Sequence, residues 1–322
     1  MPTFGEYIPR VRAAVPKSTA TVYNTYWRII ERDWTTRALD DPSATEIEQM
    51  VHDHQRNAVV RANSRDGRAA VGNFVAAFRC LYRHAERDRL IFPFDNPAAL
   101  VEKPPPLPGL RHALTVVQIH ELAHVAATTG NDPALDALIV RLHIETACRR
   151  AAVLRLEVGD LDVEDCLVKL HEKGGIMRWH PISPTLMTHL LRHVSERGGR
   201  DTTTRVLRYR KGHPLSRRRY DTLFARIRAH LPWAASLQVS AHWIRHTTVT
   251  WVEREFGLAI ARAYAGHSEH TSARSATTFT YVRPSVVELA EALAALTGEP
   301  HPLARNGRHP LAPRHETGGT RA

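Results

Sequence analysis

The chain has 322 residues, 43% of them hydrophobic, which accommodates two ordinary domains with packed cores. Its net charge of +11 indicates a polyanionic partner. Three scattered cysteines without a CxxC pair indicate neither a disulfide framework nor a cysteine-based zinc site. The chain begins without an apolar signal segment and has no run long enough to span a membrane, so we expect a cytoplasmic protein.

The first hundred residues are predicted to be helical. Ser18 is a candidate cap for one helix, and Ser43 with Glu46 forms a capping box that opens another. No strand pattern interrupts the helical spacing of the apolar residues. The pattern predicts a helical N-terminal domain over residues 1–102. Its expected helices span residues 18–34, 43–60 and 67–88.

A proline-rich stretch, KPPPLPGL, follows at residues 103–110. Three consecutive prolines cannot lie inside a helix or a central strand. Their stiff, extended conformation suits a tether between domains. We therefore place the domain boundary here.

The second domain is predicted to be mostly helical, with one small sheet, over residues 111–297. Two strand-like runs, at 166–171 and 177–182, flank Gly174-Gly175 and indicate a hairpin. The tail at 298–322 is rich in Pro, Gly, Arg and His and is expected to be disordered. The expected helices span 115–127, 133–148, 150–156, 184–197, 215–230, 241–256, 258–265 and 285–296.

Five segments of this domain each supply a residue type that phosphoryl transfer uses. Arg149 follows an apolar helix, and its guanidinium is a permanently charged fork that matches a phosphate. Lys173 lies at the expected hairpin tip in a chain with only five lysines, and its ammonium can act as an acid. Taken singly, each is better explained as a solvated surface cation.

The other three segments supply histidines, a second arginine and a tyrosine. His242 and Arg245 are three residues apart on an expected helix, which puts both on one face. His267 follows a glycine turn in AYAGHSEH, and Tyr281 supplies a phenol in TTFTYVRPS. A single tyrosine between threonines is usually a packing residue. Tyr264 is the alternative phenol.

Two metal-binding interpretations compete with this one. HWIRH has two histidines at i and i+4, as zinc metalloproteases do, but Trp243 stands where their general-base glutamate would be. His267 and His270 could ligate a metal, yet a protein site needs three or four ligands. We expect neither a metal nor another cofactor.

The order Arg, Lys, HxxR, GH, Tyr is similar to the catalytic signature of the tyrosine recombinases, the phage-integrase family. ACRRAAVLRLEVGDLD resembles their first-arginine box, and LHEKGGIMRWHPI resembles their lysine-bearing hairpin. AHWIRHT resembles the HxLRHT box, AGHS resembles the LGHS box, and NPAALVEKP resembles the domain junction. The resemblance covers about residues 115–296.

This resemblance implies a helical core-binding domain joined to a mostly helical catalytic domain, which together clamp double-stranded DNA. It also implies a homotetramer on synapsed DNA sites. Arg149, Arg245 and His267 would bind the scissile phosphate. The helix at 285–296 would then pack on a neighbouring protomer, although it could equally cap its own domain.

The implied reaction is attack by Tyr281 on the phosphodiester, which forms a 3′-phosphotyrosyl bond. His242 would act as the base, and Lys173 would protonate the leaving 5′ oxygen. A phenol whose ordinary pKa is about 10 needs neighbouring cations and a base to attack at neutral pH. No Walker loop is present, in keeping with a covalent link that makes ATP unnecessary.

Three departures from the family pattern stand out. Ala147 occupies a position that usually holds Gly, and Ala152 one that usually holds an acidic residue, which is expected to loosen support for Arg149. The stretch from His267 to Tyr281 is longer than usual.

Alternative functions stay open on the sequence. A type IB topoisomerase or a telomere resolvase shares the active-site logic of a recombinase. A degenerate relative would bind DNA without cutting it, but all six catalytic-type residues are present, which argues against that. The leading prediction is a site-specific recombinase, an integrase of a mobile element.

Overall fold

The computed structural model describes residues 1–57, 67–105, 112–172, 175–199, 201–266 and 284–304. The chain divides into two compact units, Met1–Pro108 and Gly109–Ala322. Within the described residues the secondary structure is helical apart from a three-stranded sheet, so the predicted mainly α class is confirmed. No helix in these ranges combines the length and apolarity needed to cross a bilayer.

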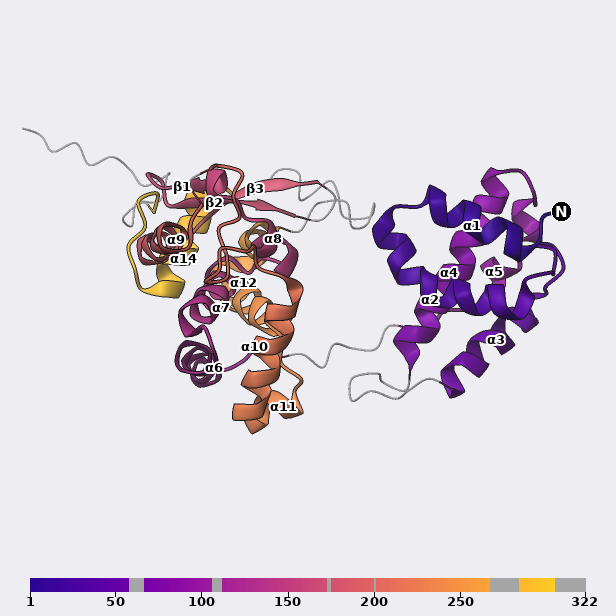
Figure 1. Cartoon of the computed structure of the whole chain (residues 1–322), viewed down its shortest axis with the longest axis horizontal. Helices are drawn as coiled ribbons and strands as arrows, with labels where there is room; N and C mark the ends of the chain where they lie inside the picture. The colour runs from indigo at the N-terminus through magenta and orange to yellow at the C-terminus, as the bar shows by residue number, and fades with distance from the viewer. Residues whose placement is uncertain (58–66, 106–111, 173–174, 200, 267–283, 305–322) are drawn as a thin grey trace, which may run out of the picture. The chain divides into compact units, whose positions relative to one another are not determined.

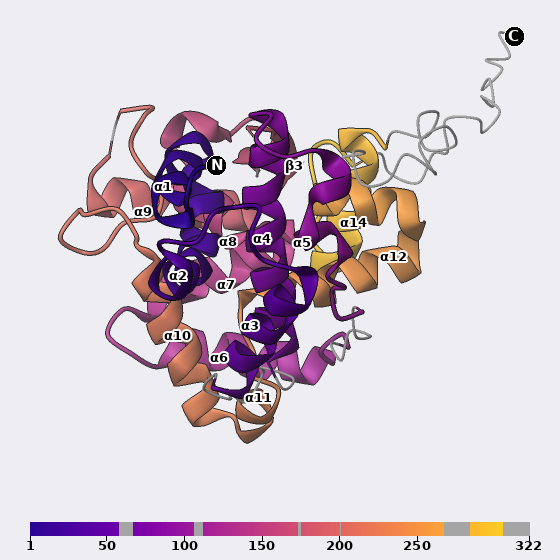
Figure 2. The same cartoon turned by 90° about the vertical axis from the view of Figure 1, so that its right-hand side faces the viewer.

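The N-terminal unit is a bundle around one central helix, α4, which contacts α1, α2, α3 and α5 (Figures 1 and 2). One face of α4 is apolar, and Phe74 and Phe78 stack on it with ring centroids 5.3 Å apart. The elements are α1 (Phe4–Ala14), α2 (Lys17–Trp34), α3 (Ala44–Arg56), α4 (Arg68–Arg87), α5 (Pro97–Leu100) and a 3-10 turn at Pro93–Asp95.

The capping box at Ser43 and Glu46 is confirmed, because each side chain bonds the backbone N–H of the other. The prediction that Ser18 caps α2 is wrong. Pro16, in an extended conformation, is the N-cap residue, and α2 begins at Lys17. Proline has no N–H and a fixed φ, so it suits a helix start and moves Ser18 into the first turn.

The second unit, Gly109–Ala322, contains the domain that the family resemblance implies to be catalytic and is called the catalytic unit; it packs its helices beneath a small sheet. Figure 1 shows the sheet at one end of this unit and α11 at the other. The helices are α6 (Val116–Thr128), α7 (Pro133–Thr146), α8 (Arg150–Arg155), α9 (Pro184–Arg197), α10 (Arg217–His230), α11 (Pro232–Ser236), α12 (Ala241–Ala265) and α14 (Val286–Thr297), with a 3-10 turn at Val158–Asp160. The antiparallel strands, in the order β1-β2-β3, are β1 (Leu161–Asp162), β2 (Leu167–His171) and β3 (Met177–Pro181).

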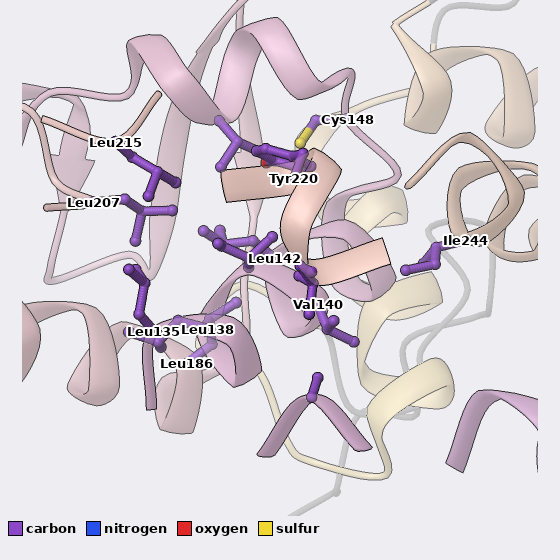
Figure 3. Close-up of a cluster of buried hydrophobic side chains, with 14 of the residues drawn as sticks. Leu135, Leu138, Val140, Leu142, Cys148, Leu186, Leu207, Leu215, Tyr220 and Ile244 are labelled. Atoms are coloured by element: carbon purple, nitrogen blue, oxygen red, sulfur yellow. The ribbon is translucent and has the colours of Figure 1, made fainter. Parts of the chain in front are cut away.

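Helix α7 is the centre of this unit. It contacts α6, α9, α12 and α14, and nine of its 14 residues are buried. A helix that is apolar on most sides has to be enclosed by others. Figure 3 shows Leu135, Leu138, Val140 and Leu142 of α7 in the buried cluster that they share with Leu186 of α9 and Ile244 of α12.

The C-terminal helix packs on its own unit. The face of α14 that carries Leu289, Ala290 and Leu293 is buried, and α14 contacts α12, β3 and α7; Figure 2 shows it beside α12. Of the two alternatives, capping its own domain is therefore the arrangement in this structure. The expectation of packing on a neighbouring protomer concerned the DNA-bound state and stays a prediction.

The stretch from Gly298 to Ala304 is ordered, so the predicted disorder from residue 298 is wrong there. Glu299 accepts hydrogen bonds from the backbone N–H and the hydroxyl of Thr185, each at 2.7 Å. His301 is buried, with its ring 3.3 Å from the carbonyl oxygen of Cys166. A polar composition does not prevent order when cap and side-chain partners are available. The remaining tail lies outside the described residues.

Candidate active site

The position of Arg149 follows from the way α7 ends. Ala147, buried at the C-cap, adopts a left-handed conformation with φ 46° and ψ 22°. This turn lets the chain reverse directly into α8, of which Arg149 is the N-cap residue. A left-handed conformation costs an alanine about 1–2 kcal/mol that glycine does not incur, which explains why glycine suits this position. The departure at Ala147 therefore leaves the backbone path intact.

Arg245 forms hydrogen bonds to the C-terminal ends of two helices, α7 and α12. Its side chain is 5% exposed, and its Nη2 donates to the carbonyl oxygen of Ala265, 2.7 Å away, at the C-terminal end of α12. Its Nη1 donates to the carbonyl oxygen of Ala147 at the end of α7. Such terminal carbonyls lack helical partners. Burial lowers the pKa of Arg245 to about 10, so the guanidinium is still charged at neutral pH.

One pocket of about 330 Å³ brings three of the predicted site residues together. Arg149 and Arg245 line it, and so does His242, which is exposed on the same face of α12 as Arg245. Arg150 and Arg228 line it too, so four guanidiniums surround one cavity. This arrangement is suited to binding a phosphate, because each guanidinium offers a fork of donors and a permanent charge.

A buried hydrogen-bond chain supports the backbone beside Arg149. Burial lowers the pKa of His143 to about 4, so its ring is neutral at pH 7. Its Nδ1 lies 3.2 Å from the carbonyl oxygen of Cys148 and must donate to it, so Nε2 accepts from the hydroxyl of Tyr220, 2.9 Å away. Cys148 and Tyr220 both line the pocket and belong to the buried cluster in Figure 3.

Lys173, His267 and Tyr281 lie outside the described residues. Their described neighbours are informative at one point. Gly266 has φ 60°, and a Cβ atom added there would lie 2.4 Å from Nε of Arg178. A glycine is therefore required immediately before His267, both for the left-handed turn and for the close approach.

Tyr264 is wrong as the alternative nucleophile. Its side chain is fully buried, and its hydroxyl donates to the carbonyl oxygen of Glu145. Burial raises the pKa of Tyr264 well above 10. The hydroxyl of Tyr220 is also committed, to His143. The hydroxyl groups of Tyr264 and Tyr220 are therefore both engaged inside the protein, and neither is available to attack a phosphodiester.

The described part of the chain has no cluster of three or more His, Cys, Asp or Glu residues that could hold an ion. His267 and His270 lie outside the described residues. In HWIRH, Nδ1 of His246 lies 3.0 Å from the hydroxyl of Thr250, a local contact within the helix.

Three residues of the site were not predicted from the sequence. Arg150 follows Arg149 directly, so the pair in ACRR was an available signal. Arg228 is one of several arginines on α10, and nothing in the sequence distinguishes it. Glu172 precedes Lys173 and accepts a hydrogen bond from Nη1 of Arg149 at 2.7 Å, a contact that only the fold creates.

A helical unit with a small antiparallel sheet, whose HxxR pair and first-box arginine share one pocket, defines a protein of the tyrosine recombinase class. The sequence profile of the phage integrase family matches residues 112–284, and the chain belongs to this family. It is a recombinase, an enzyme class that cleaves and rejoins DNA.

Similar proteins agree with this assignment. The chain is 24% identical over 268 residues to the tyrosine recombinase XerC of Pelobacter propionicus, which covers 83% of each protein. Its structure is similar to that of a lambda integrase dimer bound to a COC′ core site, with a TM-score of 0.63 and 16% identity over 86% of this chain and 97% of the other. The Tn1549 transposon integrase in complex with circular intermediate DNA also has a TM-score of 0.63, with 16% identity over 88% and 97%. Both of these solved structures have the same fold as this chain.

Proposed function

We propose that the protein is a site-specific recombinase that cuts double-stranded DNA by attack of Tyr281 and rejoins it to a new partner. The observation that carries the proposal is the pocket in which Arg149, His242 and Arg245 come together. Its cations suit a phosphodiester, and Tyr281 is the tyrosine that follows the GH box. No tyrosine inside the described core of the catalytic unit competes for the role, because Tyr264 and Tyr220 are buried and hydrogen-bonded.

In the proposed reaction, the oxygen of Tyr281 forms a bond to phosphorus while the bond from phosphorus to the 5′ oxygen breaks. Arg149, Arg245 and His267 bind the non-bridging oxygens, whose charge grows in the transition state. Preorganised donors of this kind each contribute about 3–4 kcal/mol in other enzymes. The rigid seating of Arg245 between two helix ends provides such preorganisation.

Two protons move in this reaction. His242 takes the proton of the phenol, which suits a residue exposed in the pocket beside Arg245. Lys173 gives a proton to the departing 5′ oxygen, which would otherwise leave as a strongly basic alkoxide. Rejoining runs the same steps in reverse, with the 5′ hydroxyl of another strand as the nucleophile.

The partner is proposed to be double-stranded DNA, bound by a homotetramer across two synapsed sites. Related structures support this: one is a lambda integrase tetramer bound to a Holliday junction. The similarity to a transposon integrase bound to circular intermediate DNA favours a role in a mobile element. The proposed compartment is the cytoplasm.

The decisive test replaces Tyr281 by Phe and measures covalent adduct formation on a nicked suicide substrate. Wild-type protein should accumulate the adduct, and Tyr281→Phe should form none while its DNA affinity stays within about twofold, because only the nucleophilic oxygen is lost. Tyr209→Phe is the matched control, since Tyr209 does not line the pocket and its hydroxyl lies 3.2 Å from that of Ser216. An adduct with Tyr281→Phe would exclude Tyr281 as the nucleophile.

The proposed acid is tested with a bridging sulfur. Lys173→Ala should cleave ordinary DNA about 10²–10⁴-fold more slowly, the usual contribution of a positioned acid. When sulfur replaces the bridging 5′ oxygen, the leaving thiolate needs no proton, so this variant should regain most of its rate. Arg149→Ala should not, because it lacks a phosphate contact instead. Equal rescue of both variants would assign the acid to another group.

Strand exchange separates recombinase from topoisomerase activity. A recombinase should join strands between two synapsed sites, and should leave a supercoiled plasmid that lacks the site intact. Relaxation of that plasmid without exchange would favour a type IB topoisomerase.

A further inference from the structure

Glu172 is a buried carboxylate held between two arginines behind the pocket. It follows the last residue of β2, and its side chain is 2% exposed. Its Oε2 accepts a hydrogen bond from Nη1 of Arg149 at 2.7 Å, and its Oε1 lies 3.4 Å from Nη2 of Arg178. Its backbone N–H donates to the carbonyl oxygen of Ile176 at 2.7 Å, across the hairpin. Backbone and side chain are therefore both fixed.

Because Glu172 is buried, its ion pairs with Arg149 and Arg178 are important. A carboxylate is removed from water at a cost of several kcal/mol and is tolerated only when cations and donors replace the water. Within the described residues, Glu172 is the carboxylate that forms an ion pair with Arg149 and with Arg178. Arg178 depends on it strongly, because its own Nε and Nη1 are buried and have no hydrogen-bond partner there.

The hydrogen bond to Glu172 restricts the orientation of the Arg149 side chain. The side chain of Arg149 is 41% exposed, and a half-exposed arginine has many rotamers unless a partner selects one. The hydrogen bond to Glu172 engages only Nη1. The guanidinium is thereby oriented, while its other terminal nitrogen can meet a phosphate in the pocket.

We propose that Glu172 is a positioning residue for Arg149 in strand cleavage. It supplies, from the hairpin, the acid that this chain lacks at Ala152, a buried side chain that offers no acceptor. Because Glu172 directly precedes Lys173, the same carboxylate links the phosphate-binding arginine to the segment that carries the proposed general acid. This inference rests on the proposed function.

The same unit contains a matched control. Asp136 is fully buried and also lies between two arginines, with Oδ1 2.7 Å from Nε of Arg219 and Oδ2 bonded to Arg226. None of these three residues lines the pocket. Asp136→Asn and Glu172→Gln therefore each remove one buried negative charge from between two arginines. Only Glu172 contacts a residue that lines the pocket.

The first experiment measures single-turnover adduct formation on the nicked substrate, with DNA affinity measured in parallel. Glu172→Gln should cleave about 10–100-fold more slowly than wild type, the scale of a misplaced contact, with affinity within about twofold. Asp136→Asn should cleave at the wild-type rate below its own melting temperature. Glu172→Asp keeps the charge and should retain more activity than Glu172→Gln. A wild-type rate for Glu172→Gln would overturn the inference.

The second experiment uses a substrate whose scissile phosphate is a methylphosphonate. This group carries no charge, so it needs the guanidinium of Arg149 less. The deficits of Arg149→Ala and Glu172→Gln should shrink together, which a loss of general stability would not produce. Relief of Arg149→Ala alone would show that Glu172 is only structural. If wild-type protein forms no adduct on either substrate, the proposed function itself fails; an active wild type confines any failure to Glu172.

Discussion

The two units bury different kinds of side chain. In the described part of the N-terminal unit, Asn96 is the buried polar residue, and the rest of the core is aliphatic or aromatic. The catalytic unit encloses carboxylates, imidazoles and guanidiniums, among them Asp136, His143, Glu172, Arg219 and Arg245. Buried charges seldom increase stability over apolar packing of the same volume. The catalytic unit thus holds buried guanidiniums rigidly, through the ion pair of Arg219 with Asp136 and through the hydrogen bonds of Arg245 to two helix-end carbonyl groups.

The largest expected effect tests the apolar unit. Phe78 is fully buried and packs on Phe74 and Trp34. Phe78→Ala should lower the free energy of unfolding of the N-terminal unit by about 3–5 kcal/mol, through lost burial and a cavity. Hydrogen exchange should show faster exchange in α4 and unchanged protection in α7. Equal loss of protection in both helices would mean that the units do not unfold separately.

The next effect tests the charged unit. Arg245→Ala removes the proposed phosphate contact and leaves the carbonyl groups of Ala147 and Ala265 without this donor. The cleavage rate on the nicked substrate should fall by about 10²–10³-fold, as for loss of one preorganised donor. Arg245→Lys keeps a charge but cannot reach both carbonyls, so it should rescue little. Full activity of the lysine variant would show that a point charge suffices.

The smallest effect, counted for each residue, is a difference in acid sensitivity. Burial lowers the pKa values of His143 and His193 to about 4, and that of His180 well below 6.5; all three lie in the catalytic unit. Above pH 6.5 these rings are neutral in both folded and unfolded chains, so their contribution to stability is complete. As the pH falls from 6.5 through 4, only the unfolded chain gains the protons, and stability is lost.

Each of these histidines should reduce the free energy of unfolding by about 1.4 kcal/mol per pH unit in that window. In the N-terminal unit burial lowers the pKa of one described histidine, His54, so its acid dependence should be shallower. Denaturant titrations at pH 7 and pH 5, read by hydrogen exchange in α4 and α7, measure the difference. His193→Gln should flatten the profile of the catalytic unit. Parallel profiles for the two units would contradict the prediction.

The sequence by itself determined the features that depend on neighbours a few residues away. The capping box at Ser43 opens a helix as predicted, because a cap needs only the backbone of its own first turn. The break at Gly257, with φ 84°, was likewise readable from a glycine between two helical patterns. The order of the five boxes was sufficient to identify the family. The three-residue spacing of His242 and Arg245 also predicted that both lie on one helix face.

The tertiary structure decided everything that depends on segments distant in the chain. Glu172 reaches Arg149 across 23 residues, and the hydroxyl of Tyr264 reaches Glu145 across 119. Neither pairing has a local signal, so the sequence does not predict the contact of Glu172 and leaves Tyr264 open as the alternative to Tyr281. The packing of α14 on its own unit has the same origin. Burial and charge pairing depend on which side chains become neighbours in the folded core. A residue's type alone therefore does not determine whether it is buried or which charge it pairs with.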